Sequence, residues 1–208
     1  MSRSPRIVLR SLIGAAAIGL GCVGCASSST PTSAPTPQPT PLARLNTAAM
    51  ELPRIDFCAL VPRTAVKEAL TAAHSSSTHW GNGQRTDLAG VGQQVVAEHG
   101  CAWTAGTAVA RAWTYAPPVT AGLAQAVVAQ SRQQGQRQRC HDLSGPPFGQ
   151  PSLTQICTDG GTHRVRHAGL FGDTWLTCEV ADDAGVAAVR HRADAWCVDI
   201  ANVLNMTR

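Results

Sequence analysis

The sequence predicts an α+β domain, an antiparallel sheet packed by about three helices and stapled by disulfides, at the end of an exported chain. Segments with helical and strand periodicity follow one another over residues 51–208 in the order helix, strands, helix, strands, helix. An antiparallel sheet packed by helices is the simplest fold for that order. Six cysteines are spread over the same segments, and a charged, then apolar, N-terminus precedes them.

The first half of the domain is expected to hold one helix and two strands. Proline suits the start of a helix, so we place this start at residues 60–62, before apolar residues at helical spacing, namely Ala65, Val66, Ala69 and Leu70. Residues 75–92 are polar and contain glycine, which indicates a long loop. Residues 95–104 and 107–115 have the alternation and composition of strands.

The second half is expected to hold a helix, three strands and a final helix. The first helix follows Pro117-Pro118 and is expected to end at Gly135. The strands are placed at residues 153–158, 163–170 and 174–181.

The C-terminal helix has the clearest pattern of all. Its apolar face is formed by residues at helical spacing: Val186, Val189, Ala193, Trp196, Cys197, Ile200, Val203 and Leu204. Asp182 or Asp183 is expected to cap its first turn, because a carboxylate accepts hydrogen bonds from free backbone N–H groups there.

Residues 1–24 have the pattern of a secretory signal peptide. Arg3, Arg6 and Arg10 give a basic start, and residues 11–24 are uncharged and largely apolar. That run is shorter than the ~20 apolar residues that a membrane-spanning helix needs. A basic start, a short apolar core and small residues at its end are typical of an exported precursor.

Residues 21–27 resemble a bacterial lipobox, in which a small residue precedes a cysteine. The resemblance implies that this thiol receives a diacylglyceryl group and that a signal peptidase cuts just before it. Cys25 is the favoured site and Cys22 the alternative. Cleavage before Cys25 leaves six cysteines for pairing, whereas cleavage before Cys22 leaves Cys25 as an odd thiol in an oxidising space.

A tether is expected between the anchor and the domain. Residues 26–50 contain five prolines among serine, threonine and alanine, and no acidic residue. Such a composition cannot bury enough apolar surface to fold, so residues 25–50 should be extended and reach at most roughly 75 Å. The predicted domain then occupies residues 51–208.

The six remaining cysteines indicate disulfides. Fifteen connectivities are open in principle, and sequence-local pairing is the simplest of them. It pairs Cys58 with Cys101, Cys140 with Cys157, and Cys178 with Cys197. The domain has no Cys-x-x-Cys spacing, so we expect neither a metal nor a redox site, and no cofactor.

The segment Ile55-Asp56-Phe57-Cys58-Ala59-Leu60-Val61-Pro62 resembles the opening of a family of actinobacterial, mycobacterial-type lipoproteins of unknown function. Cys101-Ala102-Trp103 is similar to the Cys-x-Trp strand of the same family, and residues 172–178 match it less closely. The resemblance implies exported, lipid-anchored, disulfide-bonded domains, and it offers no enzyme activity that can be carried across to this chain. The second half is also similar to the extracellular sensor domains of mycobacterial kinases, a likeness too slight to carry an inference.

Few residues point to chemistry. His163 and His167 share one strand face and His141 lies beside Cys140, but a solvated face explains them better than a zinc site. The chain has no Gly-x-Ser-x-Gly elbow, and its four glutamates form no evident pair for glycoside hydrolysis. We therefore expect no enzyme and no catalytic residue.

Two features remain as binding candidates. Arg132, Arg137 and Arg139 form either a patch for anions or lipid headgroups or, as we prefer, a solvated basic loop. Trp80 stands in the polar segment and is the tryptophan expected to line a ligand cleft. Three further tryptophans are expected to pack in the core: Trp103, Trp113 and Trp196.

The charge balance limits the class of partner. From Cys25 onward 14 basic residues face 13 acidic ones, so the mature chain lacks the basic surface of a nucleic-acid binder. We expect a lipoprotein on the extracytoplasmic face of the cell membrane, acting as a non-catalytic binding or accessory module. An envelope lipid, a wall fragment and an envelope protein are the candidate partners. An envelope hydrolase and a purely structural lipoprotein are the alternatives.

Overall fold

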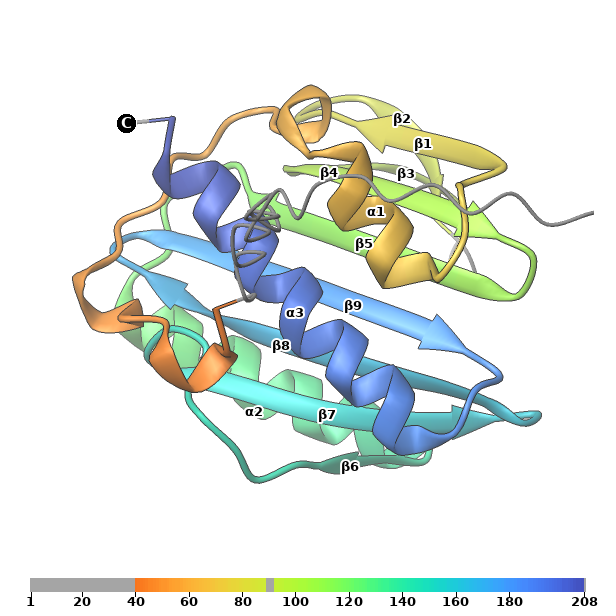
Figure 1. The fold of residues 1–208 in the computed structure, drawn as a ribbon. Helices are drawn as coiled ribbons and strands as arrows, with labels where there is room; N and C mark the ends of the chain where they lie inside the picture. The colour runs from red at the N-terminus through yellow and green to blue at the C-terminus, as the bar shows by residue number, and fades with distance from the viewer. Residues whose placement is uncertain (1–39, 89–91, 208) are drawn as a thin grey trace, which may run out of the picture. The chain divides into compact units, whose positions relative to one another are not determined.

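A seven-stranded antiparallel sheet organises the molecule (Figure 1). The computed structural model describes residues 40–88 and 92–207, so the predicted signal peptide, Cys22 and Cys25 lie outside it. The strand order is β1-β4-β5-β9-β8-β7-β6, and every neighbouring pair is antiparallel. The seven strands are β1 (Ser76–Trp80), β4 (Glu98–Ala105), β5 (Ala108–Tyr115), β6 (Cys140–Asp142), β7 (Ser152–Asp159), β8 (Thr162–Phe171) and β9 (Thr174–Asp182).

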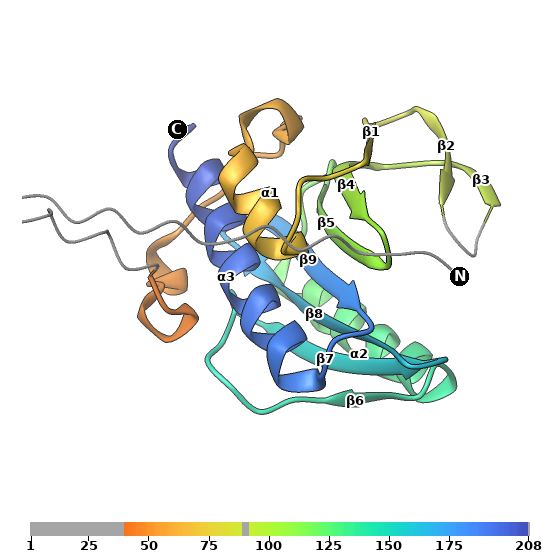
Figure 2. The ribbon, with the colours of Figure 1, turned by 45° about the vertical axis from the view of Figure 1, so that its right-hand side comes forward.

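Helices cover the sheet from both sides (Figures 1 and 2). Helices α1 (Arg63–Leu70) and α3 (Val186–Asn205) pack on one face, called here the α3 face. Helix α2 (Ala121–Arg137) packs on the opposite face, the α2 face, over strands β6, β7 and β8. The predicted α+β fold, with an antiparallel sheet, three helices and disulfides, is confirmed.

The main core lies between the sheet and α3. The rings of Trp103 and Trp196 meet edge to face there, with their centroids 5.4 Å apart. Strand β5 presents Ala108, Ala110 and Ala112 to this core, and all three are buried. Side chains alternate between the two faces of a strand, so the large residues of β5 are directed to the α2 face, where Trp113 is partly exposed. The expectation that Trp113 packs in the core is therefore wrong, whereas Trp103 and Trp196 do.

The expected loop at residues 75–92 is instead largely strand. It contains β1 and β2 (Arg85–Leu88), and β2 pairs with β3 (Gly92–Val95) in a separate two-stranded sheet. Four of the five residues of β1 are exposed, because this strand lies at the edge of the large sheet. Backbone hydrogen bonds to β4 hold β1 in place. Its side chains can therefore be polar, and the sequence shows no alternation of apolar and polar residues there.

The described end of the expected tether packs against the domain. Residues 40–50 contain two 3₁₀ turns, Leu42–Arg44 and Thr47–Ala49, and the side chains of Leu42 and Met50 are buried. Thr174 Oγ1 then donates a hydrogen bond to the carbonyl of Leu52. The folded unit thus begins earlier than the predicted residue 51.

Two helix ends differ from the expectation. Helix α2 continues through Gly135 to Arg137. Gly135 is buried, and a Cβ atom there would lie 2.7 Å from Gln155 Nε2 and 3.2 Å from Cys140 Cβ, so this glycine suits close packing and does not mark the helix end. Helix α3 starts after Gly185 without a side-chain cap. Asp182 instead accepts a 2.6 Å hydrogen bond from Arg192 Nη2.

The six cysteines form three disulfides, and they are the pairs that sequence-local pairing predicts. Cys58–Cys101 joins the 3₁₀ turn Cys58–Leu60 to β4, Cys140–Cys157 joins β6 to β7, and Cys178–Cys197 joins β9 to α3. Each disulfide joins two elements that are neighbours in the fold. By linking them covalently, it restricts the conformations that are open to the unfolded chain.

Candidate functional site

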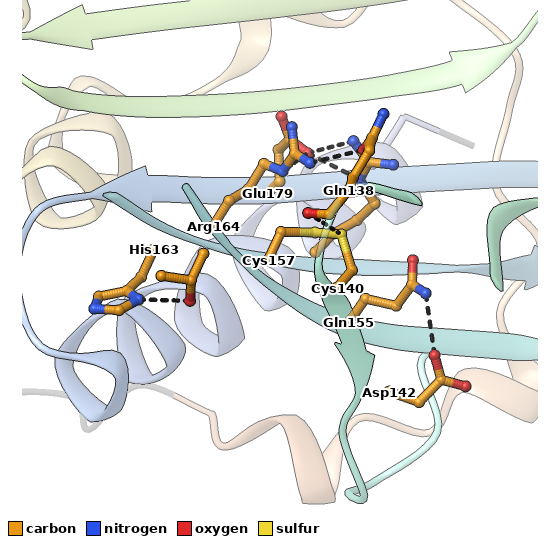
Figure 3. Close-up of a disulfide and its surroundings, with 10 residues drawn as sticks. Gln138, Cys140, Asp142, Gln155, Cys157, His163, Arg164 and Glu179 are labelled. Carbon is orange, nitrogen blue, oxygen red and sulfur yellow. Dashed lines mark hydrogen bonds and ion pairs between the residues drawn. A yellow bond between two sulfur atoms is a disulfide. The ribbon is translucent and has the colours of Figure 1, made fainter. Parts of the chain in front are cut away.

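An arginine-lined recess opens on the α2 face, beside the part of the sheet that α2 covers. Its volume is about 540 Å³. Four arginines and two carboxylates supply its charges: Arg111, Arg137, Arg139, Arg164, Asp159 and Glu179. We call this cavity the arginine recess, and Figure 3 shows the side of it next to the Cys140–Cys157 disulfide.

Glu179 forms the floor of the arginine recess. Strand register places it directly opposite Arg111 of β5 and Arg166 of β8. Its carboxylate lies 3.3 Å from Arg111 Nη1 and 2.8 Å from Arg166 Nη2, and only 2% of its side chain is exposed. Burial by itself raises the pKa of Glu179, but the arginines around it together hold that pKa below its ordinary value.

Arg164 forms one wall. Its Nη2 donates a 3.2 Å hydrogen bond to Gln138 Oε1, and its Nε lies 3.9 Å from Glu179 Oε2 (Figure 3). Burial lowers the pKa of Arg164 and Glu179 opposes that change. An arginine remains charged under such conditions, so this wall carries a fixed positive charge.

Arg137 and Arg139 form the rim. Arg137 is the last residue of α2, and Arg139 follows with a left-handed backbone (φ 56°) just before the Cys140–Cys157 disulfide. Both side chains are exposed, and within residues 40–88 and 92–207 neither makes an ion pair. The third member of the predicted cluster is elsewhere, because Arg132 binds Asp142 at 2.7 Å.

Trp80 lines none of three cavities that open in the described part of the chain. Its side chain is buried, and its ring packs where a side chain on Gly100 would lie, 2.4 Å from the position of a Cβ atom. Its indole donates a 3.1 Å hydrogen bond to Glu98 Oε1. These contacts give Trp80 a packing role. On the same face Arg166 lies over the Trp113 ring, 5.4 Å from its centroid.

A larger groove, of about 980 Å³, lies between α1, α3 and residues 40–44. Its floor includes Ala65 and Ala69 of α1, and its charged residues have both signs. Asp199 is the unusual one, because burial and then the nearby Glu68 raise its pKa to about 6. Since positive and negative groups are mixed along this groove, no ligand charge is favoured there.

Thr154, His167 and Asp194 form a hydroxyl–imidazole–carboxylate chain, the order of groups used in nucleophilic catalysis. Thr154 Oγ1 lies 3.0 Å from His167 Nδ1, and Asp194 Oδ1 lies 2.8 Å from His167 Nε2. The second contact is short but lacks hydrogen-bond geometry. His167 is 2% exposed, and Thr154 lines none of the same three cavities of the described chain. We therefore assign these three side chains a structural role in the core.

The histidines do not converge on a metal site. His163 bonds Thr158 at 3.0 Å, His141 is exposed on the edge strand β6, and His167 is buried. Across the residues that the structure describes, no three groups able to bind a metal lie together. In the same part of the chain, no helix has both the length and the apolar character to cross a membrane.

No known protein family and no curated protein matches the sequence. Among solved structures, the chain is similar to the extracellular domain of PknH from Mycobacterium tuberculosis, with a TM-score of 0.47, 14% identity, and coverage of 73% of this chain and 97% of that one. It is also similar to a GTP-binding regulator from Thermotoga maritima, with a TM-score of 0.32, 13% identity, and coverage of 64% and 84%. At these TM-scores neither likeness bears on function.

Proposed function

We propose that this chain is an extracytoplasmic binding module that holds a negatively charged ligand in the arginine recess and is anchored to the cell membrane through Cys25. The observation that carries the proposal is the charge of the cavity. Four arginines and two carboxylates line it, which leaves a surplus of two positive charges in one open recess. Clustered positive charge in a partly desolvated cavity attracts anions more strongly than the same charges spread over a surface.

The three disulfides support the location. Disulfides form and persist in oxidising compartments and are rare in the cytosol. Six cysteines of the described domain are paired, in agreement with export by a signal peptide at residues 1–24.

The chemistry of the recess supports binding without catalysis. Guanidinium groups stay protonated, so the four arginines can neither accept nor release a proton near neutral pH. Glu179 has a depressed pKa and is held ionised by its arginine partners. General acid–base catalysis needs a group that changes its protonation near the working pH, and these groups do not.

The binding proposal is tested by calorimetry on the full mature protein in detergent, with citrate and sulfate as probe anions and spermidine as the cation. Both anions should bind, and spermidine should not. The double variant Arg137→Gln, Arg139→Gln should weaken anion binding about tenfold, because it removes two charged hydrogen-bond donors from the rim.

The matched control is Arg63→Gln with Arg85→Gln. This variant lowers the net charge by two, as the rim variant does, but both of its arginines are exposed and lie outside the recess. Equal weakening by the two double variants would show attraction by net charge alone and would overturn the recess as the site. Absence of anion binding in the wild-type protein would overturn the proposal itself.

The anchor is tested by intact mass spectrometry and detergent partitioning. The mature chain should start at an acylated Cys25, and Cys25→Ala should leave an unprocessed precursor. Acylation at Cys22 would refute the assigned site but not the anchor. A soluble, unacylated mature chain would refute both.

A further inference from the structure

We infer that the arginine recess recognises a phosphoryl group with two negative charges, as found in a phosphomonoester. This inference rests on the proposed anion-binding function and names the class of its ligand. It is drawn from the charge count, the directions from which the arginines approach, and the walls between them.

The charge count favours a dianion. The lining residues have a surplus of two positive charges, and Arg166 contacts Glu179 from outside the cavity. Arg166 offsets part of the charge of Glu179 from outside, so Arg111 and Arg164 keep positive charge to offer a ligand although both lie next to Glu179. A phosphomonoester carries about −1.5 to −2 charges near neutral pH, whereas a single carboxylate or a phosphodiester carries one.

The arrangement of donors favours a group with several oxygens pointing in different directions. Arg111 comes from β5, Arg164 from β8, and Arg137 and Arg139 from the end of α2. A planar carboxylate offers two oxygens to one guanidinium fork, while a terminal phosphoryl group offers three. Arginine is also the residue whose rigid fork suits phosphate best.

Two of the four arginines are held in place before any ligand arrives. Arg111 is fixed by Glu179 at 3.3 Å and Arg164 by Gln138 at 3.2 Å. Arg137 and Arg139 are exposed and make no ion pair in the part of the chain described, so they can close over a ligand. Binding a ligand therefore has to order only the two rim side chains, which lowers its cost in conformational entropy.

The walls indicate what carries the phosphoryl group. A volume of about 540 Å³ exceeds what one phosphate fills and falls within the range of small-molecule sites. The uncharged walls contain small side chains, Val109, Thr158, Thr162 and Ala181, and no aromatic ring. A small phosphorylated polyol such as glycerol 3-phosphate fits such walls better than a planar base. The same group occurs free and as the headgroup of phosphatidic acid.

The experiment compares glycerol 3-phosphate with the diester glycerophosphoglycerol, using calorimetry on the full mature protein in neutral detergent. The monoester should bind about tenfold more tightly than the diester, because the diester has one negative charge and no terminal phosphoryl group. The double variant Arg137→Gln, Arg139→Gln should abolish this preference. The control with Arg63→Gln and Arg85→Gln should retain it.

Micelles doped with phosphatidic acid or with phosphatidylglycerol then distinguish the two sources. Displacement of glycerol 3-phosphate by phosphatidic acid alone supports a lipid headgroup, and no displacement by either lipid supports a free phosphate ester. Equal binding of monoester and diester, or tighter binding of citrate, would overturn the phosphoryl inference and leave the anion-binding module standing. If no anion binds, both fail.

Discussion

Replacing Glu179 by glutamine tests the electrostatic design of the arginine recess. The substitution keeps the shape of the side chain and removes the charge that three arginines surround. Removing one partner of a buried ion pair costs about 3–5 kcal/mol. The side chains of Arg111, Arg164 and Arg166 are 32%, 28% and 29% exposed, so they can turn toward water, and we discount the loss to about 2–3 kcal/mol.

The loss should depend on pH in one direction. The pKa of Glu179 in the folded protein lies below its ordinary value of 4.5. A carboxylate of this kind stabilises the fold above its unfolded pKa, and the stabilisation disappears as the pH falls through the folded pKa. The difference in the free energy of unfolding between wild type and Glu179→Gln should therefore be full at pH 7 and decrease below pH 4.5.

Urea denaturation at pH 7 and pH 3.5 measures both effects. The midpoint temperature of the variant at pH 7 should fall by about 5–10 °C in a parallel thermal melt. Asp159→Asn is the control, because it removes an exposed carboxylate from the same cavity. Surface substitutions usually change the free energy of unfolding by less than about 0.5 kcal/mol. A loss below that value for Glu179→Gln at pH 7, or an equal loss for the control, would refute the reasoning.

Three further predictions concern stability. Asp199→Asn should stabilise the protein at pH 8 by about 1 kcal/mol after allowance for solvent screening, and should have no such effect at pH 3.5. The reason is that a pKa of about 6 in the folded protein makes the ionised form of Asp199 unfavourable. A pH-independent effect in urea denaturation would contradict this. Gly100→Ala should cost about 1–3 kcal/mol by displacing Trp80, read from tryptophan fluorescence, and an unchanged midpoint would contradict it. Replacing Cys178 and Cys197 by alanine should cost about 3 kcal/mol in the same melts, while a chelator added to wild type changes nothing.

Most of the fold could be predicted from side-chain periodicity, and the exceptions have a physical cause. Helix α3 has a buried side with apolar residues at helical spacing, while β9 and the second half of β8 are buried on both faces, so apolar residues mark these elements in the sequence. Strand β1 has almost no buried side and is held by backbone pairing, which leaves no such signal. The alternation of side chains along β5 can be predicted from the sequence. Which of its two sides faces the core cannot, because the small alanines face it and Trp113 does not.

The candidate site was only partly visible. Arg137 and Arg139 were singled out because they lie close together in the sequence. Arg111, Arg164 and Glu179 come from three separate strands, and only strand register brings them together. A charged residue at an otherwise apolar strand position, such as Glu179 among the buried residues of β9, is the one sequence signal that could have pointed to the floor of the recess.

The end of α2 and the rim of the arginine recess lie at the same place in the chain. Gly135 packs closely against Gln155 and Cys140, and α2 continues two residues past it to Arg137. The rim arginines line the recess together with Glu179 and Ala181 of β9, and the Cys140–Cys157 disulfide fixes the chain directly after them. A helix ending at Gly135 would leave both arginines on a solvated loop, which is where the sequence alone places them. The end of α2 at Arg137, two residues beyond Gly135, therefore places the first rim arginine on a helix.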